Sequence, residues 1–282
     1  MCRLMLYLGP EATLSALLVE PEHSLIRQSV HSKEREEPLN GDGFGVGWYS
    51  SDHSTEPAVF RSITPAWNNR NLQNLARVVS SDCVLAHVRA ATQSSGVNDA
   101  NCHPFRWRQY LCMHNGDVAN FRLVRRKLLE SVCDEAFSNV YGSTDSEHFF
   151  ALFIDSLLQL DEPDPALRMA QALARAIGRA LALVRSAGAD GDSYLNVAIS
   201  DGEHAVVSRF TDAADGVAES LYYVTGQIYR DVGPGAKRKG TPAVVVSSER
   251  LTAHTGWTAV PPNQIIILRR DREPQFIDAV SH

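Results

Sequence analysis

Two amphipathic segments in the middle of the chain, flanked on both sides by short apolar runs, constrain the fold most. One stripe of apolar side chains recurs at helical spacing between residues 143 and 160, and a second runs from Ala170 to Val184. The proline-containing stretch from Asp161 to Pro165 separates them, and Gly188 follows the second stripe. This pattern predicts an antiparallel helix pair packed on a flat surface.

The apolar runs on either side are the size of strands. They cover residues 3–8, 43–49, 57–63, 83–91 and 109–116 before the helix pair, and 194–200, 204–210, 221–227, 243–249 and 264–270 after it. Shorter helical patterns cover residues 69–79 and 121–129, and Asp201-Gly202 is a hairpin signal between two strands. Strands that mostly follow one another directly favour an α+β fold with antiparallel sheets over a doubly wound parallel sheet. Because no long linker interrupts the chain, we expect a single domain over residues 2–282.

Charge and run length exclude two classes of partner. The net charge is -6, without the clustered Lys/Arg face of a nucleic-acid-binding domain. The longest apolar runs, such as Ala243 to Val246, are far below the roughly 18 residues of a membrane span. The amino terminus lacks a signal-peptide pattern, and five cysteines without a CxxC pair suit a reducing compartment. We therefore expect a cytoplasmic protein with no nucleic-acid or membrane partner.

Cys2 is the residue with the clearest potential for chemistry. If the initiator methionine is removed, the chain begins with a thiol and a free α-amine on one residue. An α-amine with a pKa near 8 is a base that needs no other residue to position it. The thiolate is the nucleophilic form of cysteine. Cys2 could then supply both roles, although its position alone also suits an ordinary strand residue.

Short polar motifs fall at the ends of predicted strands, where catalytic residues commonly lie. They are NGDGFGVGW (40–48), AHVRAAT (86–92), NCHPF (101–105), MHNGD (113–117) and GSTDSE (142–147). The Asn115 side chain and the Gly116 backbone N–H can stabilise an oxyanion. Arg89 and Asp145 suit the carboxylate and the ammonium of an amino-acid-like group. Each motif alone could be a turn or an ion pair, but together they describe an amide-cleaving site.

An amino-terminal cysteine followed in order by GDGFG, HVRAAT, CHP, HNG and TDSE resembles the class II glutamine amidotransferases, which are N-terminal-nucleophile hydrolases. The motif set covers at least residues 2–155. A narrower similarity, carried by HSLIRQS (23–29), SITPAWNNRNL (62–72) and the GSTDSE segment, is to the stand-alone γ-glutamyl hydrolases of this class. That group includes enzymes of glutathione degradation and of the ergothioneine pathway.

The resemblance implies a role for each matching residue. It implies that Cys2 is the nucleophile with its own amine as base, and that Asn115 and Gly116 form the oxyanion hole. The glutamyl group would be held by Arg89, Thr92 and Asp145, and His114 of the HNG motif is placed among the substrate-binding residues. The implied fold is a four-layer αββα sandwich, and no cofactor is implied. The implied products are glutamate and an amine, unless a separate peptidase or synthase subunit takes the amine up.

Three other interpretations remain open from the sequence. His87, Cys102, His103, Cys112 and His114 are residue types that bind zinc, although their spacing matches no standard site. The glycines at 41, 43, 45 and 47 could suggest a dinucleotide loop, but their alternation is not GxGxxG. Finally, the chain could be a non-catalytic glutamyl-binding or regulatory subunit of a larger complex.

Overall fold

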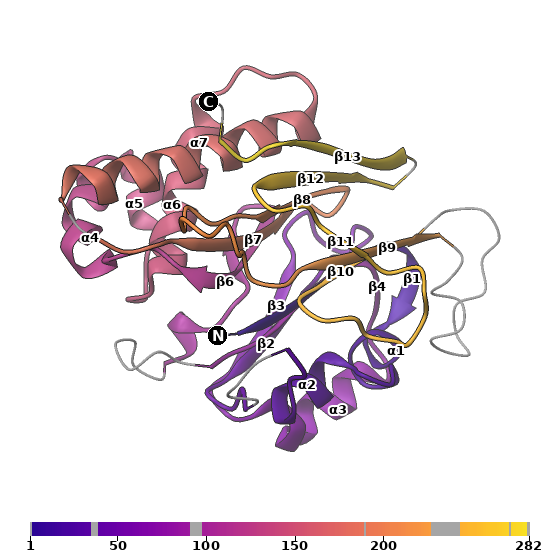
Figure 1. The fold of residues 1–282 in the computed structure, drawn as a ribbon. Coiled ribbons are helices and arrows are strands. Elements are labelled where there is room, and N and C mark those ends of the chain that lie inside the picture. The colour runs from indigo at the N-terminus through magenta and orange to yellow at the C-terminus, as the bar shows by residue number, and fades with distance from the viewer. Residues whose placement is uncertain are drawn as a thin grey trace.

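Two antiparallel sheets stacked face to face form the centre of the molecule (Figure 1). The computed structural model describes residues 2–34, 39–90, 98–188, 190–226, 243–270 and 272–280. The seven-stranded sheet has the order β11 (Thr258–Ala259), β9 (Tyr222–Gly226), β10 (Ala243–Ser247), β1 (Arg3–Thr13), β4 (Ser80–Val88), β2 (Phe44–Trp48) and β3 (Ala58–Ser62). The six-stranded sheet has the order β13 (Arg272–Asp278), β12 (Gln264–Arg269), β8 (His204–Arg209), β7 (Tyr194–Ser200), β6 (Tyr110–Asp117) and β5 (Phe105–Trp107).

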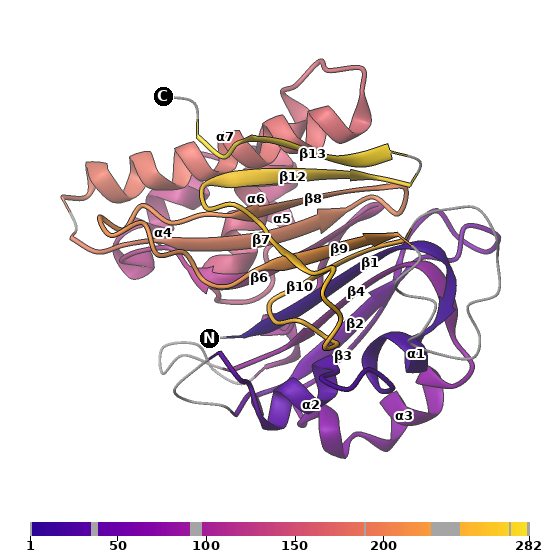
Figure 2. The same cartoon turned by 45° about the vertical axis from the view of Figure 1, so that its right-hand side comes forward.

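Helices cover the outer face of each sheet, which makes four layers (Figure 2). The seven-stranded sheet carries α1 (Leu14–Leu18), α2 (Leu25–Val30) and α3 (Arg70–Ala76). The six-stranded sheet carries α4 (Phe121–Glu130), α5 (Asp134–Ser138), α6 (Asp145–Leu158) and α7 (Pro165–Ser186). Two short 3-10 turns occupy Ala66–Asn68 and Asp99–Asn101. Within the described part of the chain, no helix is both long and apolar enough to span a bilayer.

The alternation of side chains along β1 explains the layering. Leu4, Leu6 and Leu8 pack between the two sheets, whereas Met5 and Tyr7 pack under the helices of the outer face. A strand buried on both faces reads as a continuous apolar run, as RLMLYL does. The four-layer αββα arrangement predicted from the sequence is confirmed.

The predicted helix pair is present as α6 and α7. The Thr144 hydroxyl caps α6 by accepting from the Glu147 N–H, and the Asp164 carboxylate caps α7, which begins at Pro165. Nearly every residue of α6 is buried, because this helix packs on β5 and β6 and is flanked by α4, α5 and α7. The first turn of α6 is therefore fixed in place, and Asp145 is part of it.

The structure corrects several sequence-based expectations. Strand β1 does not end at Gly9-Pro10 but continues to Thr13, with an irregular register between Leu8 and Ala12. A bulge tolerates a proline, which has no N–H for the ladder. Helices α1, α2 and α5 and strands β5, β11 and β13 were not predicted, since each is short or, as in β13, largely exposed and polar.

Candidate active site

Most of the residues selected from the sequence line one cavity of about 670 Å³. They are Cys2, Arg89, His114, Gly116 and Asp145. Cys2 precedes β1, Arg89 follows β4, Gly116 lies near the end of β6, and Asp145 begins α6. The start of β1 and helix α4 lie toward the same side of the molecule in Figures 1 and 2. Asn115 lies behind the cavity wall rather than in it, and Thr92 lies outside the described residues.

Cys2 differs from the other cysteines in its surroundings. Its thiol is partly exposed in the cavity, where Sγ donates to the Ala90 carbonyl oxygen at 3.6 Å. Burial raises the pKa of Cys83 to about 12 and that of Cys102 to about 11, and it raises the pKa of Cys112 well above the usual range. Cys133 is exposed but lies outside the cavity wall. Cys2 is thus the cysteine placed to react with a ligand in this cavity.

The turn before β2 holds Arg89 in position. The Arg89 N–H donates to the Gly43 carbonyl at 2.8 Å, and the Asp42 N–H donates to the Arg89 carbonyl at 3.0 Å. The Arg89 side chain is almost fully buried and contributes to the cavity wall. The NGDG motif therefore positions a guanidinium at the site, although β4 itself ends at Val88.

Asn115 and Gly116 lie where β6 passes the cavity. Gly116 has φ +146°, and a Cβ there would overlap the Tyr194 carbonyl oxygen on β7, so only glycine fits. The Asn115 side chain is fully buried, and neither its amide nitrogen nor its oxygen has a hydrogen-bond partner among the described residues. Leaving a buried amide without hydrogen bonds costs about 1–3 kcal/mol of folding free energy. Such a group can therefore gain a hydrogen bond when an acceptor arrives.

Two carboxylates, those of Asp117 and Asp145, line the cavity. Asp145 Oδ2 accepts from the Val118 N–H at 2.8 Å, which ties the start of α6 to the end of β6. Asp117 also lines the cavity, and its pKa is raised by burial and by the charge of Asp145. Two neighbouring carboxylates favour a cation between them. Asp117 belongs to the MHNGD motif, but its role was not recognised from the sequence.

His114 connects β6 to α6. Its Nε2 lies 3.0 Å from the Tyr194 carbonyl oxygen and its Nδ1 lies 2.9 Å from the Ser146 hydroxyl. Because a carbonyl can only accept, Nε2 carries a hydrogen and donates to Tyr194, and the Ser146 hydroxyl lies between Nδ1 and Asp145 Oδ1, which is 3.4 Å from it. With both nitrogens engaged by protein groups, the geometry favours a positioning role for His114 over direct substrate contact.

Comparison with known proteins decides the family. A family model described as class-II glutamine amidotransferases matches residues 23–279. The chain belongs to the class II glutamine amidotransferase family. A relative in Saccharomyces cerevisiae, the probable glutamine amidotransferase DUG3, is 40% identical over 96% of this chain and 82% of its own. The γ-glutamyl-hercynylcysteine sulfoxide hydrolase of Mycobacterium tuberculosis is 31% identical over 60% of this chain and 70% of its own.

Solved structures agree with this family assignment. A glutamine aminotransferase class-II domain protein from Silicibacter pomeroyi aligns over 98% of this chain and 99% of its own, with a TM-score of 0.69 and 26% identity. The glutamine phosphoribosylpyrophosphate amidotransferase of B. subtilis aligns over 99% of this chain and 49% of its own, with a TM-score of 0.57 and 15% identity. The second likeness shows the amidotransferase fold alone. The resemblance inferred from the motifs is confirmed at the level of family and fold.

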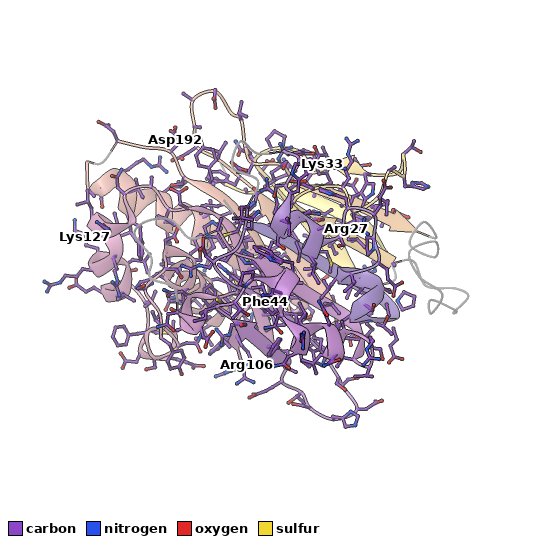
Figure 3. The ribbon with its side chains drawn as sticks, turned by 90° about the horizontal axis from the view of Figure 1, so that it is seen from below. Arg27, Lys33, Phe44, Arg106, Lys127 and Asp192 are labelled. Atoms are coloured by element: carbon purple, nitrogen blue, oxygen red, sulfur yellow. The ribbon has the colours of Figure 1, made fainter. Side chains whose placement is uncertain are left out.

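No site role was predicted from the sequence for the basic residues of α4, but two of them line the cavity. Arg122 and Arg125 line the cavity, and Arg125 Nε donates to His148 Nε2 at 3.1 Å. Arg126, by contrast, pairs with Glu130 on the exposed face, and Lys127 extends from the edge of the molecule (Figure 3). Helical spacing alone predicts one basic surface on α4, and the packing of α4 against α6 and α7 decides which of its arginines face the cavity.

Two of the competing interpretations, the zinc site and the dinucleotide loop, find no support in the geometry. Among the described residues, no group of three or more His, Cys, Asp or Glu side chains could hold a metal ion. Burial lowers the pKa of His87 to about 3 and that of His103 well below the usual range. The glycines of β2 serve close packing, since a Cβ at Gly45 would overlap the His103 carbonyl oxygen. No helix follows them, so they do not form a dinucleotide loop.

Proposed function

We propose that this protein is an N-terminal-cysteine amidohydrolase that cleaves γ-glutamyl amide bonds and releases glutamate. The observation that carries the proposal is the meeting of Cys2, Arg89, Gly116 and Asp145 in one cavity from four separate segments. The γ-glutamyl preference is supported by the name of the mycobacterial relative, whose substrate is a γ-glutamyl conjugate. The proposal takes residues 2–282 as one catalytic domain.

In the proposed reaction, removal of Met1 exposes the α-amine of Cys2. The amine accepts the thiol proton, and Sγ attacks the γ-carbonyl carbon of the substrate. The side-chain N–H of Asn115, after a small shift toward the cavity, and the Gly116 N–H donate to the oxyanion. The amine then gives its proton to the leaving nitrogen, and the C–N bond breaks to leave a γ-glutamyl thioester. Water attacks the thioester, the amine accepts one water proton, and glutamate leaves as the thiol is restored.

Recognition of the substrate uses the far end of the glutamyl group. Arg89 would pair with the α-carboxylate, and Asp145 with Asp117 beside it would pair with the α-ammonium. Binding at this end places the γ-carbonyl at Sγ, which converts binding energy into orientation. Because a nucleophilic thiol must remain reduced, the proposal also expects a reducing compartment such as the cytoplasm. A peptidase or synthase subunit could then take up the released amine.

The proposal is tested by measuring glutamate release from glutamine and from a set of γ-glutamyl dipeptides. The purified protein should release glutamate from at least one of them, and Cys2→Ser should abolish the release. Cys133→Ser is the matched control, because Cys133 is an exposed thiol outside the cavity. Binding of these compounds without release would instead favour a non-catalytic glutamyl-binding subunit.

A further inference from the structure

A buried charged cluster lies directly behind the nucleophile, and the reaction described above does not use it. It consists of Arg3, His23 and Glu249, here called the Glu249 anchor. Arg3 Nε donates to Glu249 Oε1 at 2.8 Å, and the side chain of Arg3 is fully buried. Its Nη1 donates to the carbonyl oxygen of Cys2 at 2.9 Å.

Glu249 is held on both carboxylate oxygens. His23 Nε2 lies 2.6 Å from Oε2, and the N–H groups of Lys33 and Glu34 donate at 3.0 and 3.3 Å. Burial alone would raise its pKa, but His23, these N–H groups and Arg3 together lower it to about 2. An ionised carboxylate only accepts, so the His23 ring donates to it. Through Arg3, His23 and the Lys33 N–H, Glu249 thus joins the start of β1 to the chain on both sides of α2. Lys33 is labelled in Figure 3.

Stability alone does not explain a guanidinium at this position. A buried ion pair seldom stabilises a fold more than apolar side chains of similar volume, because both charges lose their hydration. Arg3 Nη2 is also buried without a hydrogen-bond partner among the described residues, which adds to the cost. The arrangement therefore points to a role in placing the neighbouring residue.

Cys2 is a residue that needs such placement. The pairing of β1 with β4 begins at Arg3, and its pairing with β10 begins at Met5, so Cys2 lies outside both ladders. Beyond β10, the Ser248 N–H donates to the Leu4 carbonyl at 3.1 Å, and the Leu4 N–H donates to Ser248 Oγ at 3.0 Å. Residues 248–249 thus hold the chain up to Arg3, and Arg3 in turn holds the Cys2 carbonyl.

We propose that Arg3, fixed by Glu249 and His23, is a positioning residue for the N-terminal nucleophile. Rotation about the N–Cα bond of Arg3 would turn the peptide plane that carries the Cys2 carbonyl, and it would swing the amine and the thiol of Cys2 together. The bond from Arg3 to the Cys2 carbonyl restricts this rotation and keeps both groups aimed at the γ-carbonyl. This inference rests on the proposed function.

The test measures inactivation by the chloroketone analogue of glutamine, with its maximal rate and its half-saturating concentration determined separately. Arg3→Lys keeps a cation for Glu249, but an ammonium lacks the planar fork that donates to two acceptors at once. Glu249→Gln keeps the shape and removes the charge. For both variants we expect the maximal rate to fall about 10-fold or more, with the half-saturating concentration unchanged within about 2-fold.

Asp155→Asn is the matched control. It changes a carboxylate that is equally buried and paired with Arg179 at 2.6 Å, but this pair lies in the helix layer away from the cavity. The control should lower the melting temperature and leave the maximal inactivation rate unchanged. If Arg3→Lys does not fold, the maximal inactivation rate of Glu249→Gln tests the inference on its own.

Two results would overturn the inference, and they differ from each other. If the wild-type protein is inactivated and both variants match its maximal rate, Arg3 does not position Cys2, while the proposed function stands. If the wild-type protein does not react with the chloroketone at all, the proposed function fails and the inference fails with it.

Discussion

Arg89 is the residue whose proposed role separates binding from chemistry. Replacing it by alanine removes the guanidinium that would hold the α-carboxylate of the substrate. We expect kcat/KM for a γ-glutamyl substrate to fall about 100-fold, chiefly through KM. The rate of Cys2 alkylation by iodoacetamide should remain near the wild-type value, since this reagent uses no carboxylate. An unchanged kcat/KM would show that Arg89 does not bind substrate.

Gly116 tests the backbone geometry of the proposed oxyanion hole. Gly116→Ala forces a Cβ against the Tyr194 carbonyl at a φ that other residues rarely adopt. We expect a clear loss of thermal stability, and a loss of activity in the fraction that stays folded. Gly178→Ala in α7 is the control, because a Cβ there meets no atom within 4 Å. The control should stabilise the protein by about 1 kcal/mol; equal melting temperatures for the two variants would contradict this geometry.

At the scale of elements, Glu147 connects α6 to the segment before it. Its carboxylate accepts from the Tyr141 and Gly142 N–H groups at 2.9 and 2.5 Å. Glu147→Gln leaves one acceptor oxygen for two donors, so we expect the free energy of unfolding to fall by about 1–3 kcal/mol. Because Asp145 begins the same helical turn, KM for a γ-glutamyl substrate should also rise.

An exposed glutamate provides the comparison for Glu147. Glu135 accepts a hydrogen bond from Trp107 and pairs with Arg108 near the surface, so Glu135→Gln should alter neither KM nor activity. Denaturant unfolding and steady-state kinetics on both variants test this point. A rise in KM in both variants would mean that the effect does not arise at the start of α6.

Sequence patterns predict the elements that are long and regular, and they miss those that depend on distant neighbours. The α6–α7 pair was predictable from its two apolar stripes and the proline-containing stretch between them. Edge strand β13 was not, because it is mostly exposed and polar. The same limit applies to the site. Motifs located Cys2, Arg89 and Asp145, but Glu249 contacts Arg3 across 246 positions of sequence, through a strand pairing that no local pattern reveals.

At the scale of the whole molecule, the Glu249 anchor joins the two ends of the sequence and gives stability a pH dependence. A carboxyl whose pKa is about 2 in the folded state stabilises the fold above its unfolded pKa of about 4.3. This contribution, about 3 kcal/mol by linkage, is lost as pH falls from about 5 toward 2.

Comparison of the wild-type protein with Glu249→Gln measures this contribution. We expect the difference in unfolding free energy to be largest above pH 5 and to shrink at pH 3. Glu130→Gln, which alters an exposed ion pair, should show no such trend. If the difference in unfolding free energy between the two proteins is the same at pH 7 and pH 3, the ionisation of Glu249 does not contribute to stability.

The central claim is that Cys2 is the working nucleophile of a γ-glutamyl site. Its most direct test is the intact mass of the purified protein before and after exposure to the chloroketone analogue of glutamine. We expect a starting mass that lacks Met1, then a single stoichiometric adduct that is absent in Cys2→Ser and retained in Cys133→Ser. Protein that lacks Met1 and takes up no adduct, or is labelled equally in Cys2→Ser, would contradict the claim.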